Sequence, residues 1–588
     1  MITTYTSRLA TFQQQQQQLE RQLTLLASLR LAFFLGMAFA LYLYLAKGIS
    51  LMLPISLLSL LAFLFFLFRF QKTKREKQKT EKLIALCQLE LAQLQKGHLQ
   101  VPDGKEYQDA KHRYTSDLDV FGSSSLFQLL NRTSSKSGSE RLAELLKNPH
   151  DSSEKIEAYQ QAVRELGPKV DFRQQYWAEG QLNTETAKER REIEEWLQEP
   201  PQFITSSLFT ILRFTIPLLN TGLVILTIQS ERLLFIGLAL VISMLSMSVF
   251  FKHIQAFHAK VSRKKSQLDT YASLSRLIEK ESFQSENLAH IVQELRDAQK
   301  AFQQLSTASS LFDQRLNILA NMALNGLFLF DFQFIAYLEK WKNKHREQAL
   351  GWIQHLAELE VYTSLATYHY NYPHYCFSKI HGENALVMEN LSHPLILSET
   401  CVPNSLSFGN PDQFLLITGS NMSGKSTFLR SVGTSLILAQ IGAPVPATRF
   451  ETPIIRVMSS MRISDSLNDH VSYFYAELLR LQSIVEALDR GEYVFVLLDE
   501  ILKGTNSEDK LEGSRRLIRK FLSYKGLGMI ATHDLELGAL EQETQERVRN
   551  YCFESTISQG ELQFEYQLHR GVATNKNATF LLEKMKIV

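Results

Sequence analysis

With 588 residues the chain is long enough for several domains, and its mean hydropathy of −0.12 is that of a soluble protein, although such an average can hide apolar segments. Its 63 lysines and arginines nearly balance its 61 aspartates and glutamates, which excludes a strongly basic nucleic-acid-binding protein but leaves a local basic surface open. The cysteines are too far apart for a Cys-x-x-Cys zinc or redox pair and give no disulfide framework; they are Cys87, Cys376, Cys401 and Cys552.

An apolar pair of segments lies near the N-terminus. Residues 1–30 predict a polar helix, and neither their length nor their composition fits a cleavable signal peptide. Two uncharged runs follow, Leu31–Ala46 and Ile49–Phe68, with only two residues between them. Uncharged runs of this length predict a transmembrane hairpin over residues 31–70, with buried core helices as the alternative.

Basic residues flank this predicted hairpin on both sides. Arg21 and Arg30 precede it, and a basic cluster follows directly after it, consisting of Lys72, Lys74, Arg75, Lys77 and Lys79. Because lysine and arginine favour the cytoplasmic side of a membrane, the pattern places both ends of the hairpin, and therefore the N-terminus, in the cytoplasm. The same cluster could also touch anionic membrane lipid head groups, with a solvated helix face as the more common interpretation of such a run.

A second apolar pair predicts another transmembrane hairpin within residues 201–252. Its members are Phe214–Ile228 and Leu233–Phe251. The first is short and contains Pro217 and Asn220, so a re-entrant or tilted helix is an alternative to a full span there. The two hairpins together predict a multi-pass membrane protein of four spans, with every large segment in the cytoplasm.

The segments between and after the hairpins predict soluble helices. Residues 71–200 are a charged cytoplasmic helical region, and residues 253–380 form a second helical region rich in leucine and phenylalanine. The apolar block Leu316–Tyr337 lies within the second region and is interrupted by asparagines and an aspartate. This interruption predicts a core helix of the soluble part rather than a fifth span.

The stretch Phe414–Arg430 predicts a phosphate loop. A buried strand, Phe414–Ile417, leads into the pattern G-x-x-x-x-G-K-S, and a helix follows. Backbone N–H groups and the helix N-terminus can surround phosphate oxygens, while Lys425 would reach the β- and γ-phosphates and Ser426 would bind Mg²⁺. The predicted ligands are therefore ATP and Mg²⁺. The predicted nucleotide-binding residues are Gly419, Ser420, Asn421, Met422, Ser423, Gly424, Lys425, Ser426 and Thr427.

Two further strands predict the catalytic part of this site. The run Tyr493–Leu498 ends in Asp499 and Glu500, of which the first predicts a ligand of Mg²⁺ and the second the general base that activates water. A third strand, Gly528–Ala531, leads to His533, which we expect to sense the γ-phosphate because it lies at the ligand side of an open α/β sheet.

A polar loop follows the two acids. It runs from Lys503 to Ser507 and contains Gly504, Thr505 and Asn506. Its position predicts contact with a neighbouring subunit or with the γ-phosphate, and a plain surface turn is the alternative.

These residues resemble one family, the MutS group of DNA mismatch-repair ATPases. The resemblance covers Gly419–Thr427, Asp499–Ile501 with Gly504 and Thr505, and Thr532 with His533. The segment Val471–Phe474 is similar to the family's signature segment, in which a serine is presented to ATP bound by the partner subunit. The resemblance implies that Ser472 is this serine. It is specific over residues 355–588 and extends to residues 120–200, which are similar to the family's core domain.

The resemblance implies a fold and a set of partners. The fold class is multidomain, with α-helical transmembrane hairpins and an α-helical core and lever region, followed by an α/β P-loop NTPase domain of the ABC type over residues 381–588. The implied partners are a second copy of the chain, bound through the ATPase domains, and DNA.

The chain also departs from the family pattern. It contains no Phe-x-Glu tripeptide, the wedge with which the family reads mismatches, and its second hairpin falls in the lever and clamp region. The aromatic residue expected to stack on adenine aligns near Cys401. Few residues follow Gly571, where the family carries a helix-turn-helix that helps dimerisation. Mismatch recognition and the mode of dimerisation therefore stay open at this stage.

Three functions fit these patterns. The first is a membrane-anchored MutS-like ATPase that couples ATP hydrolysis at a dimer-composite site to DNA binding. The second is an ABC-type transport ATPase, against which stands the lack of a Leu-Ser-Gly-Gly-Gln signature. The third is a membrane scaffold that uses ATP as a conformational switch, against which stand the intact Lys425, Asp499 and Glu500.

Overall fold

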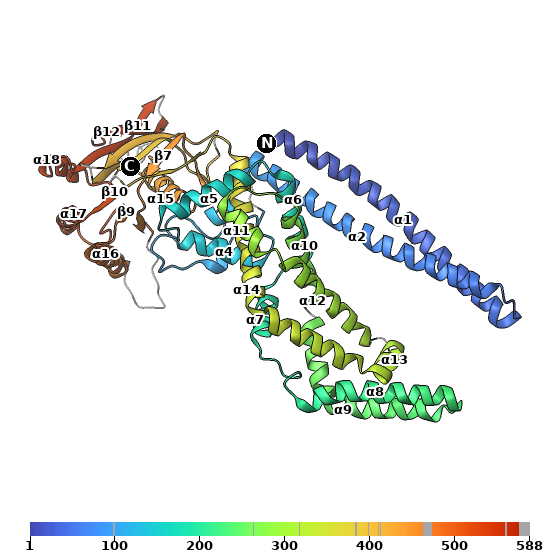
Figure 1. Ribbon diagram of the computed structural model, residues 1–588. Helices are drawn as coiled ribbons and strands as arrows, with labels where there is room; N and C mark the ends of the chain where they lie inside the picture. Colours follow the sequence, from blue (N-terminus) through green and yellow to red (C-terminus); the bar gives the residue numbers. More distant parts are fainter. Residues whose placement is uncertain are drawn as a thin grey trace.

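In the computed structural model the chain forms a C-terminal α/β domain, a helical body and two long helical hairpins (Figure 1). Both hairpins project from the helical body toward the side that faces away from the α/β domain. The structure describes residues 1–97, 100–262, 264–316, 318–382, 385–397, 399–409, 411, 413–462, 473–558 and 561–574.

The first hairpin consists of α1 (Ile2–Lys47) and α2 (Met52–Lys96), joined by a turn at Gly48 with a φ of 67°. Neither helix breaks where its apolar run ends, because the flanking glutamines, leucines and lysines are themselves good helix formers. The helix predicted over residues 1–30 and the first predicted span are therefore one continuous helix. The last turns of α2 enter the helical body, where Leu83, Leu86 and Cys87 are buried.

The second hairpin consists of α8 (Ser207–Ser230) and α9 (Leu234–Ser262). Helix α8 continues through Pro217 without a break. The side chain of Asn220 is buried one turn further on, and its Nδ2 donates a hydrogen bond to Ser243 Oγ of α9 at 2.8 Å. The asparagine that interrupts the apolar pattern is thus paired inside the hairpin, as expected for a polar group among apolar helices.

Four helices in the described part of the chain, α1, α2, α8 and α9, are long and apolar enough to cross a membrane. Most of the side chains in their apolar stretches are exposed on the surface of the protein, which is unusual for leucine and phenylalanine in such numbers. The apolar runs that the sequence predicts as spans are therefore not packed into a soluble core.

The block Leu316–Tyr337 is not the single helix that we expected. It contains the end of a short 3₁₀ helix, then α13 (Ile318–Phe328) and the beginning of α14 (Phe330–Asn371). Leu329 separates the two α-helices with a φ of 46°, a left-handed conformation that ends α13. Helix α13 lies against α8 and α9 of the second hairpin. The prediction of one helix was wrong. The sequence does not indicate the break, because the residue at the break is neither glycine nor proline.

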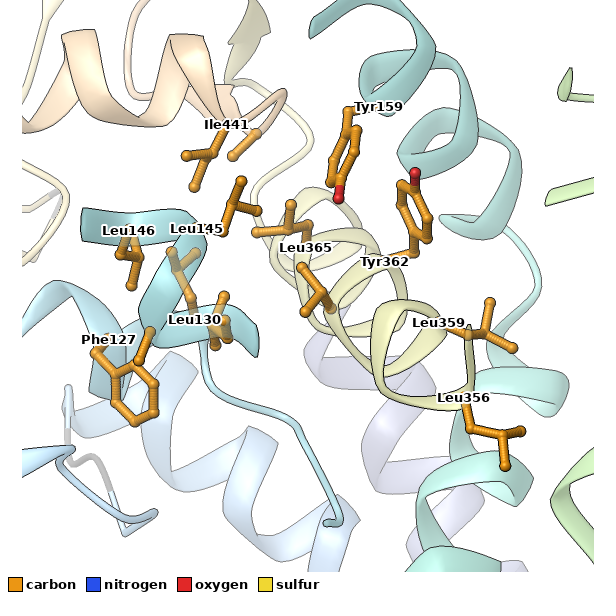
Figure 2. Packing of buried hydrophobic residues seen from close by; sticks show 14 of the residues in the cluster. Phe127, Leu130, Leu145, Leu146, Tyr159, Leu356, Leu359, Tyr362, Leu365 and Ile441 are labelled. Carbon is orange, nitrogen blue, oxygen red and sulfur yellow. The ribbon is translucent and has the colours of Figure 1, made fainter. Parts of the chain in front are cut away.

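The helical body is built around α14, a helix of 42 residues. Figure 2 shows Leu356, Leu359, Tyr362 and Leu365 of α14 among apolar side chains of neighbouring helices and of the α/β domain. The surrounding helices are α3 (Leu126–Leu130), α4 (Lys136–Lys147), α5 (Ser153–Leu166), α6 (Val170–Gly180), α7 (Ala187–Gln198), α10 (Lys265–Glu279), α11 (Glu286–Glu294) and α12 (Ala298–Phe312).

A buried carboxylate fixes α14 to the start of α4. Glu360 accepts hydrogen bonds from the backbone N–H groups of Ser134 and Ser135 at 2.7 and 3.0 Å, just before α4 begins. Burial raises the pKa of Glu360 to about 7 in spite of these bonds. Because the carboxylate satisfies N–H groups at a helix N-terminus, it locks the register of α14 against the body.

The α/β domain contains a six-stranded sheet with the strand order β12-β11-β5-β10-β9-β8 and a four-stranded sheet with the order β2-β7-β3-β4; β1 and β6 pair separately. Its strands are β1 (Cys376–Phe377), β2 (Lys379–Ile380), β3 (Ala385–Leu391), β4 (Asn404–Gly409), β5 (Phe414–Gly419), β6 (Pro444–Val445), β7 (Arg449–Thr452), β8 (Arg456–Ser460), β9 (Val494–Asp499), β10 (Gly526–Thr532), β11 (Val548–Ser558) and β12 (Glu561–Arg570). Its helices are α15 (Lys425–Gln440), α16 (Tyr473–Asp489), α17 (Ser507–Phe521) and α18 (Leu540–Glu543). Short 3₁₀ helices complete the chain at η1 (Lys105–Tyr107), η2 (Asp313–Leu316) and η3 (Leu535–Ala539).

Candidate nucleotide site

The site is assembled by three parallel strands at the centre of the six-stranded sheet. In β5, β10 and β9 nearly every side chain is buried, which is why these runs are continuously apolar. Thr532 pairs with Thr418, and Ala531 pairs with Asp499. The three strands therefore end at the same level, and the segments that follow them meet at one edge, where ligands of open α/β sheets bind.

The predicted phosphate loop joins β5 to α15. Gly419 and Gly424 bracket it with φ values of 153° and 109°, in a region that side chains rarely adopt. A Cβ atom on Gly419 would also lie 2.7 Å from the carbonyl oxygen of Phe553. Both glycines are thus required by the backbone path. The hydroxyl of Ser423 is buried in the loop and has no hydrogen-bond partner among the described residues.

Lys425 is turned back onto its own loop. Its Nζ donates hydrogen bonds to the carbonyl oxygens of Gly419 and Ser420, both at 2.9 Å, and lies 3.4 Å from His533 Nε2. Burial lowers the pKa of the Lys425 ammonium, although Asp499 and Glu500 oppose this effect. The ammonium is therefore held among oxygen atoms that a bound phosphate could replace.

The two predicted ligands of the metal contact one another. Ser426 Oγ, in the first turn of α15, donates a hydrogen bond to Asp499 Oδ2 at 2.5 Å. A hydroxyl and a carboxylate oxygen are hard ligands of the kind that Mg²⁺ prefers, and Mg²⁺ takes its other ligands from water and phosphate. Within the described residues there is no cluster of three or more His, Cys, Asp or Glu side chains that could hold a metal by themselves. These two residues therefore fit a metal that arrives with its nucleotide.

Glu500 and His533 are also in contact. His533 Nε2 lies 2.7 Å from Glu500 Oε1, and Lys503 Nζ lies 3.2 Å from Glu500 Oε2. The hydrogen bond from His533, with help from Lys503, lowers the pKa of Glu500 to about 2. Glu500 has a φ of 53°, and its backbone N–H donates to Ala531 O at 2.9 Å, so the strained residue is held in place by β10.

In the loop after the two acids, one residue caps a helix and another allows a second helix to approach closely. Asn506 caps α17, since its Oδ1 accepts a hydrogen bond from the N–H of Asp509 at 2.8 Å. A Cβ atom on Gly504 would lie 2.7 Å from Phe474 Cβ, so the glycine allows α16 to approach closely. Thr505 lies between them in the turn before the cap. Ser472, the predicted trans serine, lies outside the described residues.

A cavity of about 160 Å³ adjoins the phosphate loop, and sequence reasoning missed most of its walls. Cys401 lies here, as the alignment to the adenine-stacking residue predicts, and so do Phe428 and Phe553. The cavity also contains Tyr566, which comes from β12 with a φ of 54°. Its ring is close enough that a Cβ atom on Gly424 would lie 3.2 Å from it. No local sequence signal connects Tyr566 to the loop between Gly419 and Gly424, which lies far earlier in the chain.

Comparison with known proteins gives one consistent match. Residues 415–583 match the family MutS domain V. The DNA mismatch repair protein MutS of Thermotoga petrophila is 34% identical over 203 residues, which cover 34% of this chain and 25% of that protein. The corresponding protein of Natronomonas pharaonis is 32% identical over 222 residues, covering 37% and 25%. That of Geobacillus thermodenitrificans is 32% identical over 224 residues, covering 37% and 24%.

Fold and site together define a chain in which a helical part with four long apolar helices is followed by an α/β domain. Over residues 415–583 this α/β domain is similar to MutS domain V, and the relatives named above are MutS proteins. The resemblance found in the sequence is thereby confirmed. The chain matches only about a quarter of the length of these relatives, all of it toward its C-terminal end.

The low pKa of Glu500 predicts a pH dependence of stability. In the folded protein this pKa is about 2, below the ordinary value of 4.5, so the interaction with His533 and Lys503 stabilises the fold above pH 4.5. This stabilisation is lost as the pH falls from 4.5 toward 2. The difference in Tm between the unaltered protein and Glu500→Gln should therefore narrow below about pH 4.5. A Tm difference that does not change between pH 7 and acid would contradict the lowered pKa of Glu500.

Proposed function

We propose that this protein is a membrane-anchored MutS-like ATPase that binds ATP with Mg²⁺ and hydrolyses it at a site completed by a second copy of the chain. One observation carries the proposal. Lys425, the Ser426–Asp499 pair and the Glu500–His533 pair converge at the carboxyl edge of β5, β9 and β10. Hydrolysis of a nucleoside triphosphate requires groups that bind phosphate, bind the metal and activate water, all close to the same phosphate.

The residues of the loop and its cavity support ATP as the nucleotide. The glycine conformations leave the loop backbone free to surround phosphate oxygens, and the unpaired hydroxyl of Ser423 is a spare donor inside the loop. The adjoining cavity offers aromatic rings to a flat base. Tyr566 supplies the ring that Cys401 cannot, so the departure from the family pattern at Cys401 does not remove base binding.

Each catalytic residue has a role that follows from its contacts. Lys425 would exchange the carbonyl oxygens of its own loop for phosphate oxygens, and Ser426 with Asp499 would hold Mg²⁺, which when bound would neutralise negative charge on the phosphates. Glu500 accepts a proton from the attacking water. Both of its oxygens are occupied by His533 and Lys503, so the base is restrained until these partners shift.

A second copy of the chain is the proposed source of that shift. Large apolar side chains are exposed around the site; Met422 in the loop and Leu479 on α16 have 79% and 45% of their surface accessible. Such exposure favours a protein interface. Ser472, just before α16, would then reach the nucleotide of the partner, and Glu477 links the same helix to the catalytic loop, because its Oε1 accepts a hydrogen bond from the N–H of Leu502 at 2.5 Å.

The membrane part of the proposal rests on the exposed apolar helices. An aqueous solvent would penalise so much exposed leucine and phenylalanine, whereas lipid would not. The basic residues that flank the hairpins support a cytoplasmic N-terminus and a cytoplasmic ATPase domain. DNA enters the proposal through similarity alone, because the relatives named above are DNA mismatch repair proteins.

Glu500→Gln should separate nucleotide binding from hydrolysis. The amide keeps the size of the side chain but cannot accept the proton, so turnover should fall by about 10²–10⁴-fold while ATP binding persists. Steady-state ATPase assays and binding of a fluorescent ATP analogue measure the two. Glu508→Gln, an exposed change in the first turn of α17, is the matched control and should keep full activity. Unchanged turnover in Glu500→Gln would remove Glu500 as the base, and no turnover in the unaltered protein would favour a scaffold.

Mixed dimers should test the shared site. Lys425→Ala and Ser472→Ala should each abolish turnover, because the first removes the phosphate contact and the second removes the trans serine. When the two variants are co-expressed, half of the dimers are mixed and each mixed dimer contains one intact site, so roughly a quarter of the activity should return. Purification through two different tags isolates the mixed species. Activity that never rises above that of the single variants would mean that each site is built by one chain.

DNA coupling should appear as a change in ATPase rate and in duplex mobility across a salt series. Matched and mismatched duplexes are compared at each salt concentration. Because the chain lacks the Phe-x-Glu wedge, we expect equal affinity for the two duplexes and a steep loss of affinity with salt, as phosphate contacts produce. A preference for the mismatched duplex would overturn this expectation, and binding to neither duplex would remove DNA from the proposal.

A further inference from the structure

The short helix α13 follows the second hairpin from its base toward its tip. At the base, Arg315 Nη1 donates a hydrogen bond to Ile254 O of α9 at 3.3 Å, just before α13 begins. At the other end of α13, the carbonyl oxygens of Gly326 and Leu327 accept hydrogen bonds from Asn220 Nδ2 of α8 at 3.3 and 3.0 Å. Figure 1 shows α13 beside the hairpin, with the tips of α8 and α9 extending beyond it.

The chain then reverses and returns to the base. Leu329 is fully buried at the reversal, and Phe332 of α14 stacks on Phe209, near the beginning of α8, with ring centroids 4.6 Å apart. Two residues after Leu329 in α14, Asp331 pairs with Arg315 at 3.2 Å. Ile318–Phe332 therefore consists of α13, a reversal at Leu329 and the first residues of α14. It is bonded to the hairpin at the hairpin base and again at Asn220, part of the way along α8.

The charges of the hairpin give a depth scale. Along α8 no charged residue follows Arg213 until the turn at the tip, and along α9 none precedes Lys252. From Arg213 to Ser230 is about 26 Å at about 1.5 Å per residue, close to the hydrocarbon thickness of a bilayer, about 30 Å. Asn220 lies about 10 Å beyond Arg213 and leaves only about 15 Å of α8 beyond it. If α13 stayed in water, the rest of the hairpin would be half the length needed to cross.

The surface of α13 fits lipid. Met322 and Phe328 have 62% and 55% of their surface exposed, and Met244 of the adjoining α9 has 77%. The charged Asp331, in the first turn of α14, has no exposed side-chain surface. It is paired with Arg315, whose side chain is 8% exposed. The backbone at the reversal is satisfied as well, because the N–H of Leu329 donates to Asn325 O and that of Phe332 donates to Leu329 O. Irregular backbone is tolerated within a membrane only when it is paired and buried in this way.

We infer that Ile318–Leu329 is a re-entrant membrane segment, which enters the bilayer from the cytoplasmic side beside α8 and α9 and returns through the start of α14. Its occupant on the exposed face is the acyl chains of one leaflet. The inference rests on the proposed anchoring of the second hairpin, and it makes α14 a helix that begins in the membrane and ends at the ATPase domain.

Site-directed spin labelling tests the depth of α13 directly. Single cysteines are introduced in a background in which Cys87, Cys376, Cys401 and Cys552 are replaced, and the full chain is placed in phospholipid nanodiscs. Met322→Cys and Phe328→Cys report on α13, Leu226→Cys reports on the far part of α8, and Glu347→Cys, on an exposed part of α14, is the aqueous control. An unchanged far-ultraviolet circular dichroism spectrum and a single size-exclusion peak show that each variant has folded.

The readout is the ratio of collision with oxygen, which partitions into lipid, to collision with a water-soluble nickel complex. We expect this ratio to be several-fold higher at Met322→Cys and Phe328→Cys than at Glu347→Cys, and highest at Leu226→Cys. A lipid ratio at Leu226→Cys with an aqueous ratio at both α13 sites would overturn the re-entrant segment and leave the anchoring intact. An aqueous ratio at Leu226→Cys would overturn the anchoring of this hairpin and the inference with it.

Discussion

The parallel register of β5, β10 and β9 is the constraint on which the site depends. Both faces of these strands are packed, so a slip of one residue would exchange the side chains of the two faces as well as separate the loops at the strand ends. Ala531 of β10 pairs with Ile417 of β5 on one side and with Asp499 of β9 on the other. The segments that follow these strands, which carry Lys425, Glu500 and His533, therefore lie next to one another. The chemistry of the site is thus fixed by core packing rather than by contacts among the polar residues themselves.

Helix α14 is the second organising element, because it joins both hairpins to the α/β domain. Its first turns pack on the base of α8 through Phe332. At its last residue, Asn371 accepts a hydrogen bond from Tyr5 of α1 at 2.9 Å and donates one to Glu90 of α2 at 2.6 Å. With 42 residues it is about 63 Å long at about 1.5 Å per residue. A displacement of the α/β domain therefore has one continuous path toward each hairpin, fixed in register by Glu360.

The sequence predicted the parts of the structure that depend on short, strongly patterned segments. The phosphate loop, the acids after β9 and the histidine after β10 each follow an apolar strand, and periodicity with turn residues suffices to find them. It did not predict the break at Leu329, where no glycine or proline is present, nor the role of Lys503 in holding Glu500. Tyr566 was out of reach because its place beside the loop depends on the pairing of β12 with β11, a contact set by the sheet as a whole.

The end of α2 makes the first hairpin part of the core of the helical body. Arg132 of the helical body is almost entirely enclosed, and its Nε donates a hydrogen bond to Glu90 Oε1 of α2 at 2.5 Å. Leu83, Leu86 and Cys87 fill the same junction. A truncated protein that begins after residue 96 would expose the apolar side chains of the body at this junction. It would also leave the Arg132 guanidinium without its carboxylate partner. Removing the apolar N-terminal hairpin would raise solubility, but it would also destabilise the helical body by exposing its apolar surface.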